Sequence, residues 1–220
     1  MNTMKINIHN NPNIGLYGIA TDKYCLLGTH IPHELVQQME RILNVPVHQI
    51  KIYRTDLVGA FCAANDNCLI VPDIIFAEEK LALDKLGINY KIIKTPLTAL
   101  GNNVLANNNG ALVNPEFSAV VKKQIRQALG VKVVPGTIGE LENVGSLGVT
   151  TKLGVLVSQD IHPREFNLLQ TLLNTKIFRG TINNGHNIRS GLIANSFGFI
   201  FGDHLVGSEL FQIQEALYEQ

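Results

Sequence analysis

The sequence predicts an α/β fold in which five ββαβ units close into a ring, a five-bladed α-β propeller. Three observations predict it. A short hairpin pattern recurs five times at a nearly constant step, a helical pattern follows each hairpin, and the chain opens with a strand pattern that has no hairpin or helix before it. Self-similarity at a fixed period of about 20–50 residues is the sequence signature of repeat architectures.

The hairpin opens each unit and is centred on a small residue. Successive small residues lie 44, 42, 44 and 44 positions apart. Eight positions after each of them, a strand breaker or cap ends an apolar run, and the segment between is polar or contains glycine, as a hairpin turn requires. We expect these small residues to face a crowded central axis. They are Ala20, Ala64, Ala106, Thr150 and Ala194.

A helix is expected after each hairpin, because the apolar period there changes from two to about 3.6. The clearest helix lies within 114–130, where Asn114 is expected to cap it, Pro115 to suit its first turn and Gly130 to end it. Weaker helices are expected over 33–43, 75–86, 163–173 and 208–218. Third strands then follow four of the helices, starting near Lys51, Lys91, Lys132 and Lys176.

The fifth helix has no third strand after it. The segment "KINIHN" at Lys5 begins like the other third strands, so we expect an N-terminal strand at 4–10 to complete the fifth unit and remove the exposed edge. The chain is then one domain, 1–220, with repeats at approximately 13–55, 56–97, 98–142, 143–186 and 187–220. The alternative is a generic α/β sandwich with coincidental spacing.

Composition excludes several classes of protein. With 220 residues and 45% hydrophobic content, the chain can bury a substantial core. Lys plus Arg and Asp plus Glu number 18 each, so no long-range field gathers nucleic acid, and we expect no DNA partner. Neither a targeting segment nor a membrane span is recognisable, which predicts a cytoplasmic protein without a membrane partner. Cys25, Cys62 and Cys68 form no C-x-x-C pair and are expected to be buried, reduced thiols.

Motifs that carry chemistry are missing. The sequence holds no phosphate loop, G-x-G-x-x-G turn, G-x-S-x-G elbow or H-E-x-x-H pair, so we expect no catalytic site and no cofactor. His30 and His33 could share a helical face, but nothing nearby suggests a third ligand, and no metal is expected. Most of the remaining histidines are expected to be solvated or hydrogen-bonded structural residues.

A ring of this kind resembles the pentein-like fold of the guanidino-group-modifying enzymes. In that family a cysteine nucleophile belongs to the last blade, near the C-terminus. This sequence has no cysteine after Cys68, so the last blade cannot supply that thiol. Such an enzyme remains an alternative.

The closer resemblance is to the translation initiation factor 6 family. It is carried by "NIGLYGIATDKYCLLG", "LVGAFCAANDNCLIVPD", "GTINNGHNIRSGLIANSFGFIFG" and above all "LTALGNNVLANNNGALVNPEFS", and it extends along the whole chain. The resemblance implies a non-enzymatic factor of initiation and ribosome biogenesis. It would bind the intersubunit face of the large ribosomal subunit, part ribosomal protein and part rRNA loop, and prevent premature association with the small subunit. A scaffold for other proteins is a further alternative.

A rigid ring is expected to bind through the loops that gather at one of its ends. The segments that lead into the first strands are rich in asparagine, which offers a donor and an acceptor without a charge to desolvate. Four of them carry a glycine five positions before the small residue, whereas the fifth carries Arg189, which could fork onto a phosphate or carboxylate. The candidate ribosome-binding residues are Asn10, Gly15, Asn102, Asn103, Asn143, Gly145, Asn187 and Arg189.

Structural roles are the alternative for each of these residues. Asparagine favours left-handed turns, glycine permits bends between blades, and Arg189 could form a surface ion pair of little consequence. The lysines that open the third strands are interpreted as solvated strand ends rather than an RNA track. A closed ring leaves few edges, so we expect a monomer.

Overall fold

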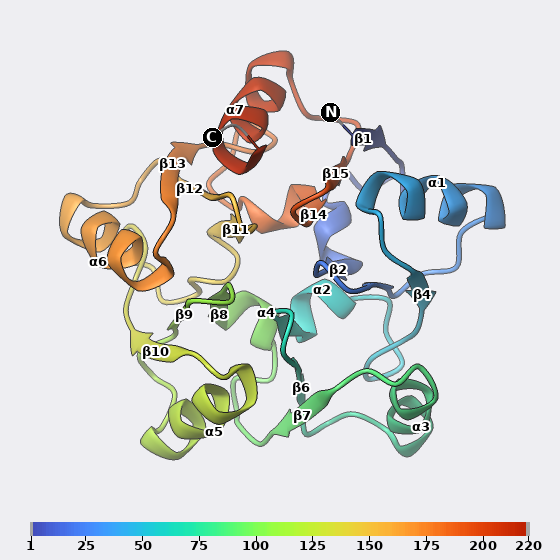
Figure 1. The fold of residues 1–220 in the computed structure, drawn as a ribbon, viewed down its shortest axis with the longest axis horizontal. Helices are drawn as coiled ribbons and strands as arrows, with labels where there is room; N and C mark the ends of the chain where they lie inside the picture. The colour runs from blue at the N-terminus through green and yellow to red at the C-terminus, as the bar shows by residue number, and fades with distance from the viewer. Residues whose placement is uncertain (1, 219–220) are drawn as a thin grey trace.

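Five three-stranded sheets stand around a central axis in the computed structural model, which describes residues 2–218 (Figure 1). In every sheet the middle strand pairs antiparallel with the inner strand and parallel with the outer one. A helix connects the middle and outer strands of four blades and covers the outside of the ring. The predicted five-bladed α-β propeller is confirmed.

The inner and middle strands form the five hairpins. The inner strands are β2 (Gly18–Ala20), β5 (Ala63–Ala64), β8 (Val104–Ala106), β11 (Gly148–Thr150) and β14 (Leu192–Ala194). The middle strands are β3 (Cys25–Leu27), β6 (Leu69–Pro72), β9 (Gly110–Val113), β12 (Gly154–Ser158) and β15 (Gly198–Phe201). All five predicted small residues line a narrow axial channel of about 50 Å³, as the crowding of five chains requires.

The outer layer consists of five helices and five strands. The helices are α1 (His33–Leu43), α3 (Ala77–Lys85), α5 (Ala119–Leu129), α6 (Pro163–Leu173) and α7 (Gly207–Tyr218). The outer strands are β4 (Val47–Gln49), β7 (Tyr90–Ile93), β10 (Lys132–Pro135), β13 (Lys176–Gly180) and the first strand, β1 (Asn2–Lys5). Gly130 ends α5 at φ 69°, as predicted.

Two features of α5 differ from the prediction. The helix begins at Ala119, and Ser118 caps it by accepting a hydrogen bond from the N–H of Val121. Asn114 instead lies before a turn, where its amide donates to Oδ1 of Asn103 at 2.8 Å. The segment "NPEFS" contains two possible caps, and the side chain of Asn114 is already engaged with Asn103 and with the N–H of Glu116.

The ring closes through β1, but the closing strand spans Asn2–Lys5 rather than 4–10. It pairs in parallel with β15, and the N–H of Ile6 donates to the carbonyl of Phe201 at 2.9 Å. Residues 8–11 form a tight turn in which His9 and Asn10 both have φ 55°. The pattern resembles a longer strand because Ile6 and Ile8 are both buried.

The same correction applies to the first unit. Its outer strand β4 ends at Gln49, and "KIYRT" is a turn in which Tyr53 and Arg54 have φ 54° and 56°. Two consecutive residues at positive φ are typical of the type I′ turn. In the third and fourth units, by contrast, Lys132 and Lys176 do open the outer strands.

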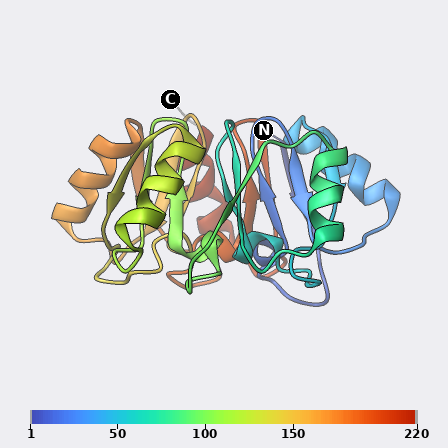
Figure 2. The same ribbon diagram turned by 90° about the horizontal axis from the view of Figure 1, so that it is seen from below.

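Each long helix packs mainly on the blade before its own. Helix α1 contacts β1 and β15, α5 contacts β6 and β7, and α7 contacts β12 and β13. The buried side chains accordingly form five clusters that combine residues of neighbouring blades. Hydrophobic burial therefore holds the blades to one another around the whole ring. Figure 2 shows this outer helical layer from the side.

Within residues 2–218, none of the helices is long and apolar enough to cross a membrane. All three cysteines are buried and unpaired by disulfides, as predicted.

Candidate functional site

Short helices surround one end of the axis, where the sequence suggested only strands and loops. They are η1 (Ile14–Leu16), α2 (Val58–Phe61), α4 (Leu100–Asn103) and η2 (Arg189–Gly191), and Val144–Leu147 form a turn at the remaining place. Neighbouring short helices contact one another. This end of the ring is therefore a continuous layer of helical turns.

Four glycines make this layer possible. A Cβ on Gly59 would overlap the carbonyl oxygen of Gly15, one on Gly101 that of Gly59, and one on Gly145 that of Gly101. A Cβ on Gly15 would overlap the carbonyl oxygen of Arg189, the residue at the fifth equivalent place. Close approach of backbones explains these glycines. The approaching backbone belongs to the neighbouring blade, so Gly145 is buried in the ring itself.

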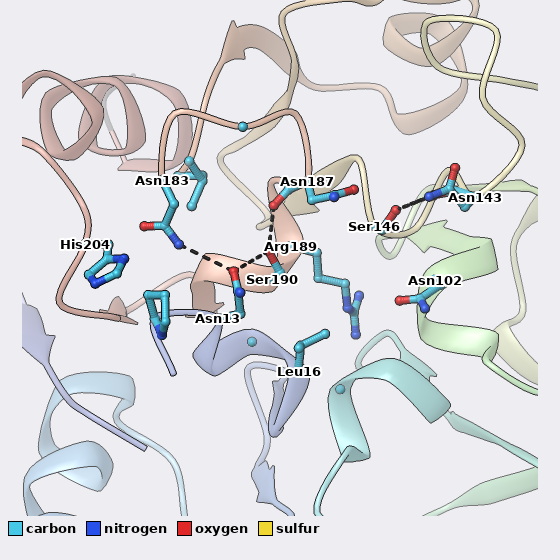
Figure 3. Close-up of a pocket in the computed structure, with 15 residues that line it drawn as sticks. Asn13, Leu16, Asn102, Asn143, Ser146, Asn183, Asn187, Arg189, Ser190 and His204 are labelled. Carbon is cyan, nitrogen blue, oxygen red and sulfur yellow. Dashed lines mark hydrogen bonds between the residues drawn. The ribbon is translucent and has the colours of Figure 1, made fainter. Parts of the chain in front are cut away.

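A cavity of about 590 Å³ opens in the centre of this end (Figure 3). Its lining is mostly polar and comes from all five units. The lining residues are Pro12, Asn13, Gly15, Leu16, Gly59, Asn102, Asn143, Ser146, Ile182, Asn183, Gly185, Asn187, Arg189, Ser190 and His204.

The structure brings five of the eight candidate residues together at this cavity. They are Gly15, Asn102, Asn143, Asn187 and Arg189.

The three other candidates do not line the cavity. Asn103 is buried and donates to the carbonyl oxygen of Ala99 at 2.8 Å, so it holds the backbone of its own blade. Asn10 is exposed in the turn beside the ring closure, where its N–H donates to Asn7 Oδ1 at 2.8 Å. The third, Gly145, packs against Gly101 as described above.

Sequence reasoning missed part of the lining. Asn13 lies in "NNPNIG" and Asn183 in "TINNG", two Asn-rich segments that carried a usable signal. Ser190 connects Asn13 to Asn187, because its hydroxyl lies 3.1 Å from Asn13 Oδ1 and 2.9 Å from the carbonyl oxygen of Asn187. No sequence pattern marks His204, which follows the fifth hairpin and reaches the rim only through the closure of the ring.

The asparagine side chains of the lining differ in whether they form hydrogen bonds within the protein. Asn143 donates to Ser146 Oγ at 2.7 Å (Figure 3). Within residues 2–218, the side chains of Asn102 and Asn187 make no hydrogen bond. Their amides are available to a partner that enters the cavity.

Among residues 2–218, Arg189 supplies the only permanent charge of the lining. Figure 3 shows its side chain reaching from η2 into the space between Leu16 and Asn102. Burial lowers the pKa of Arg189 to about 10, so the guanidinium remains charged at neutral pH. It also borders the axial channel, which it separates from the cavity.

The opposite end of the axis carries a different network. Here Nζ of Lys152 lies 2.8 Å from Asp22 Oδ2 and 3.1 Å from Asp66 Oδ2. The hairpin tips are further connected by the N–H of Asp22, which donates to Asp66 Oδ1 at 2.9 Å. The three charged groups pair with one another, which indicates a structural role.

Comparison with known proteins gives matches along the whole chain. A sequence model described as the eIF-6 family matches residues 3–216. Translation initiation factor 6 of Thermococcus onnurineus (strain NA1) is 34% identical over 224 residues, covering 99% of this chain and 98% of that protein. Translation initiation factor 6 of Saccharolobus islandicus (strain L.S.2.15 / Lassen #1) is 35% identical over 223 residues, covering 100% of both chains.

Among solved structures, DDAH from Pseudomonas aeruginosa complexed with citrulline is similar with a TM-score of 0.50. The similarity covers 76% of this chain and 68% of that chain at 12% sequence identity. At this identity the likeness shows the fold alone.

Proposed function

Because this chain belongs to the eIF-6 family, we propose that it is a translation initiation factor that binds the large ribosomal subunit at its intersubunit face and prevents premature joining of the small subunit. The mechanism requires no chemistry. Two bodies cannot occupy one surface, so the free energy of binding sets the fraction of large subunits kept apart.

The observation that carries this proposal is the polar cavity at one end of a closed ring. A face of ribosomal protein and RNA presents backbone amides, hydroxyls and phosphates. Asn102 and Asn187 offer donors and acceptors that the described part of the chain leaves unused. A neutral protein with such a surface is suited to local, shape-matched recognition rather than to binding any RNA.

The state of the cysteines favours binding over catalysis. Burial raises the pKa of Cys25 and of Cys62 to about 12, so both remain thiols at neutral pH. A nucleophilic cysteine needs a lowered pKa and access to its substrate. We therefore propose a non-enzymatic, cytoplasmic and monomeric factor that acts in protein biosynthesis and ribosome biogenesis.

Cosedimentation with isolated subunits tests the proposal. The purified protein is expected to pellet with large but not small subunits at physiological magnesium, and to reduce the joined ribosome peak when both subunits are mixed. Failure to bind large subunits would remove the function, and binding without an effect on joining would favour a scaffold. Cysteine-dependent turnover of arginine or agmatine would restore the enzymatic alternative.

A further inference from the structure

Arg189 differs from its four counterparts around the axis. The equivalent places are occupied by Gly15, Gly59, Gly101 and Gly145, which carry no side chain. The backbone of Arg189 joins the ring like theirs, since its N–H donates to the carbonyl oxygen of Ser146 at 3.1 Å. Its guanidinium is therefore an addition to the repeat that the four other units lack.

The guanidinium has more hydrogen-bond donors than the protein satisfies. An arginine side chain carries five N–H groups. Within residues 2–218, it makes one hydrogen bond, from Nη2 to the carbonyl oxygen of Cys62 at 3.2 Å, and it forms no ion pair. Nε is buried and has no partner. The residue is partly exposed at the cavity, but this part of its guanidinium is withdrawn from water without a partner, which favours a group from outside that completes the site.

The walls of the cavity define the chemistry of that group. In the described part of the chain, the lining contains no aspartate or glutamate to neutralise the cation. Beside the guanidinium lie neutral amides, among them the uncommitted side chain of Asn102 (Figure 3). A single cation below neutral amides favours one anionic group on an otherwise uncharged segment.

We propose that Arg189 is the floor of a subsite for a carboxylate of a partner protein, borne by an aspartate or glutamate side chain or by a chain terminus. A carboxylate matches the guanidinium fork and can reach the floor on a short flexible arm. An RNA phosphodiester is joined to sugars on both sides and to further phosphates, for which the lining offers no second permanent cation. The asparagine amides suit the neighbouring peptide groups.

The assignment rests on the proposed function in one respect, because the partner is taken to be a protein component of the large-subunit face. The anion subsite itself can be tested without ribosomes. Nuclear magnetic resonance follows the Arg189 Nε–Hε signal and the side-chain amide of Asn102 during titration with N-acetyl-aspartate. The uncharged control is N-acetyl-asparagine amide, in which both carboxyl groups are amides, and dimethyl phosphate is the probe for a phosphodiester.

N-acetyl-aspartate is expected to shift both signals in the wild type, and the Asn102 response is expected to vanish in Arg189→Met. N-acetyl-asparagine amide should leave them unchanged. A response to dimethyl phosphate at least as strong as that to N-acetyl-aspartate would overturn the carboxylate assignment in favour of RNA. The absence of a response to either anion would overturn the subsite altogether.

A second measurement places the subsite in the interface. Arg189→Met is expected to weaken binding to large subunits by about ten- to hundredfold, the usual effect of losing a charge-assisted hydrogen bond. Arg179→Met is the matched control, since it removes an exposed arginine from the outer strand β13. Unchanged binding by Arg189→Met would show that the partner does not use the subsite and would overturn the proposal.

The two proposals fail separately. If the wild type does not bind large subunits, the proposed function is wrong, while the titration still decides the subsite. Thermal unfolding tests whether Arg189→Met is folded. Should it not fold, Arg189→Lys keeps the charge but lacks the fork, and it is expected to lose most of the N-acetyl-aspartate response. A wild-type response in Arg189→Lys would then overturn the proposal.

Discussion

The carboxylate of Glu79 holds the turn at Arg54 from the next blade, accepting the backbone N–H of Arg54 at 2.7 Å and that of Tyr53 at 2.9 Å. The same carboxylate accepts the N–H of Phe76 at the start of α3. Glu165 and Glu209 repeat this arrangement in the turns after β10 and β13. A glutamate in the first turn of a helix thus joins its own blade to the turn that leaves the preceding one.

Glu79→Gln is expected to lower the free energy of unfolding by about 2 kcal/mol, because a buried carboxylate that accepts several N–H groups is replaced by an amide with one acceptor oxygen. Chemical denaturation measures the loss. Glu78→Gln is the matched control on the same helical turn, since Glu78 is exposed and pairs only with the exposed Arg54. Equal stability of wild type and Glu79→Gln would show that the hydrogen bonds of Glu79 to the turn contribute nothing to the free energy of unfolding.

Glu165 makes part of the stability dependent on pH. Burial raises the pKa of its carboxyl, but hydrogen bonds from Thr137 and from the N–H groups of His162, Glu140 and Gly139 outweigh burial and leave the pKa below its ordinary value of 4.5. The native state therefore favours the ionised form, and this stabilisation is present above pH 4.5 and lost as the pH falls through the lowered pKa.

The difference in unfolding free energy between wild type and Glu165→Gln should accordingly be largest near neutral pH. It should shrink below about pH 4.5 as the carboxyl takes up its proton in both the native and the unfolded state. Denaturation at a series of pH values measures it. A difference that grows on acidification would contradict the lowered pKa.

Gly59→Ala is expected to destabilise the ring by about 3 kcal/mol or prevent folding, because its Cβ would overlap the carbonyl oxygen of Gly15 in the neighbouring blade. Gly207→Ala is the control. It lies at the start of α7, and its Cβ would meet nothing within 4 Å, so stability should stay equal or rise. A wild-type melting temperature for Gly59→Ala would mean that the two blades can move apart without a loss of stability.

Lys152→Met removes the cation between Asp22 and Asp66, whose side chains are only 9% and 14% exposed. The expected loss is about 2 kcal/mol at neutral pH, less than for a fully buried pair because Lys152 is half exposed. The loss should decrease in acid, as the pH falls through the lowered pKa of Asp66 and its carboxylate takes up a proton. Lys23→Met, at an exposed lysine in the first hairpin, is the control for charge.

Binding to large subunits should not change in Lys152→Met, since its network closes the end of the axis opposite the asparagine-lined cavity. Cosedimentation at matched protein stability measures this. A weaker complex would place the ribosome at the hairpin tips and contradict the proposed face.

Asn102→Ala is expected to weaken cosedimentation with large subunits while leaving the melting temperature nearly unchanged. Its side chain makes no hydrogen bond within residues 2–218. Its backbone carbonyl, which the substitution keeps, supports the ring by accepting the N–H of Gly145 at 2.9 Å and that of Ser146 at 3.3 Å. Asn167→Ala, exposed on α6, is the control that should affect neither property. A large fall in melting temperature for Asn102→Ala would make the residue structural.

Much of the architecture was predictable because it is repeated locally. Helices α1 and α6 have the predicted bounds, and all five small residues reach the axis. The turns at 8–11 and 52–55 were mistaken for strands, since alternating burial of Ile50 and Ile52 continues past the end of β4. The hydrophobic pattern indicates which side chains are buried. It does not reveal the two positive φ values that end a strand.

The sequence by itself determined the number of blades, the order of strands and helix in each, and the need for the N-terminal segment to complete the last one. The first two follow from patterns within about 45 residues, and the third from the missing third strand after the last helix. Only the tertiary structure decided that Asn102 and Arg189 line one cavity while Asn103 does not, and that the guanidinium lacks a counter-charge. The physical reason is that these properties arise between blades, where distant segments meet and side chains are either satisfied or left free for a partner.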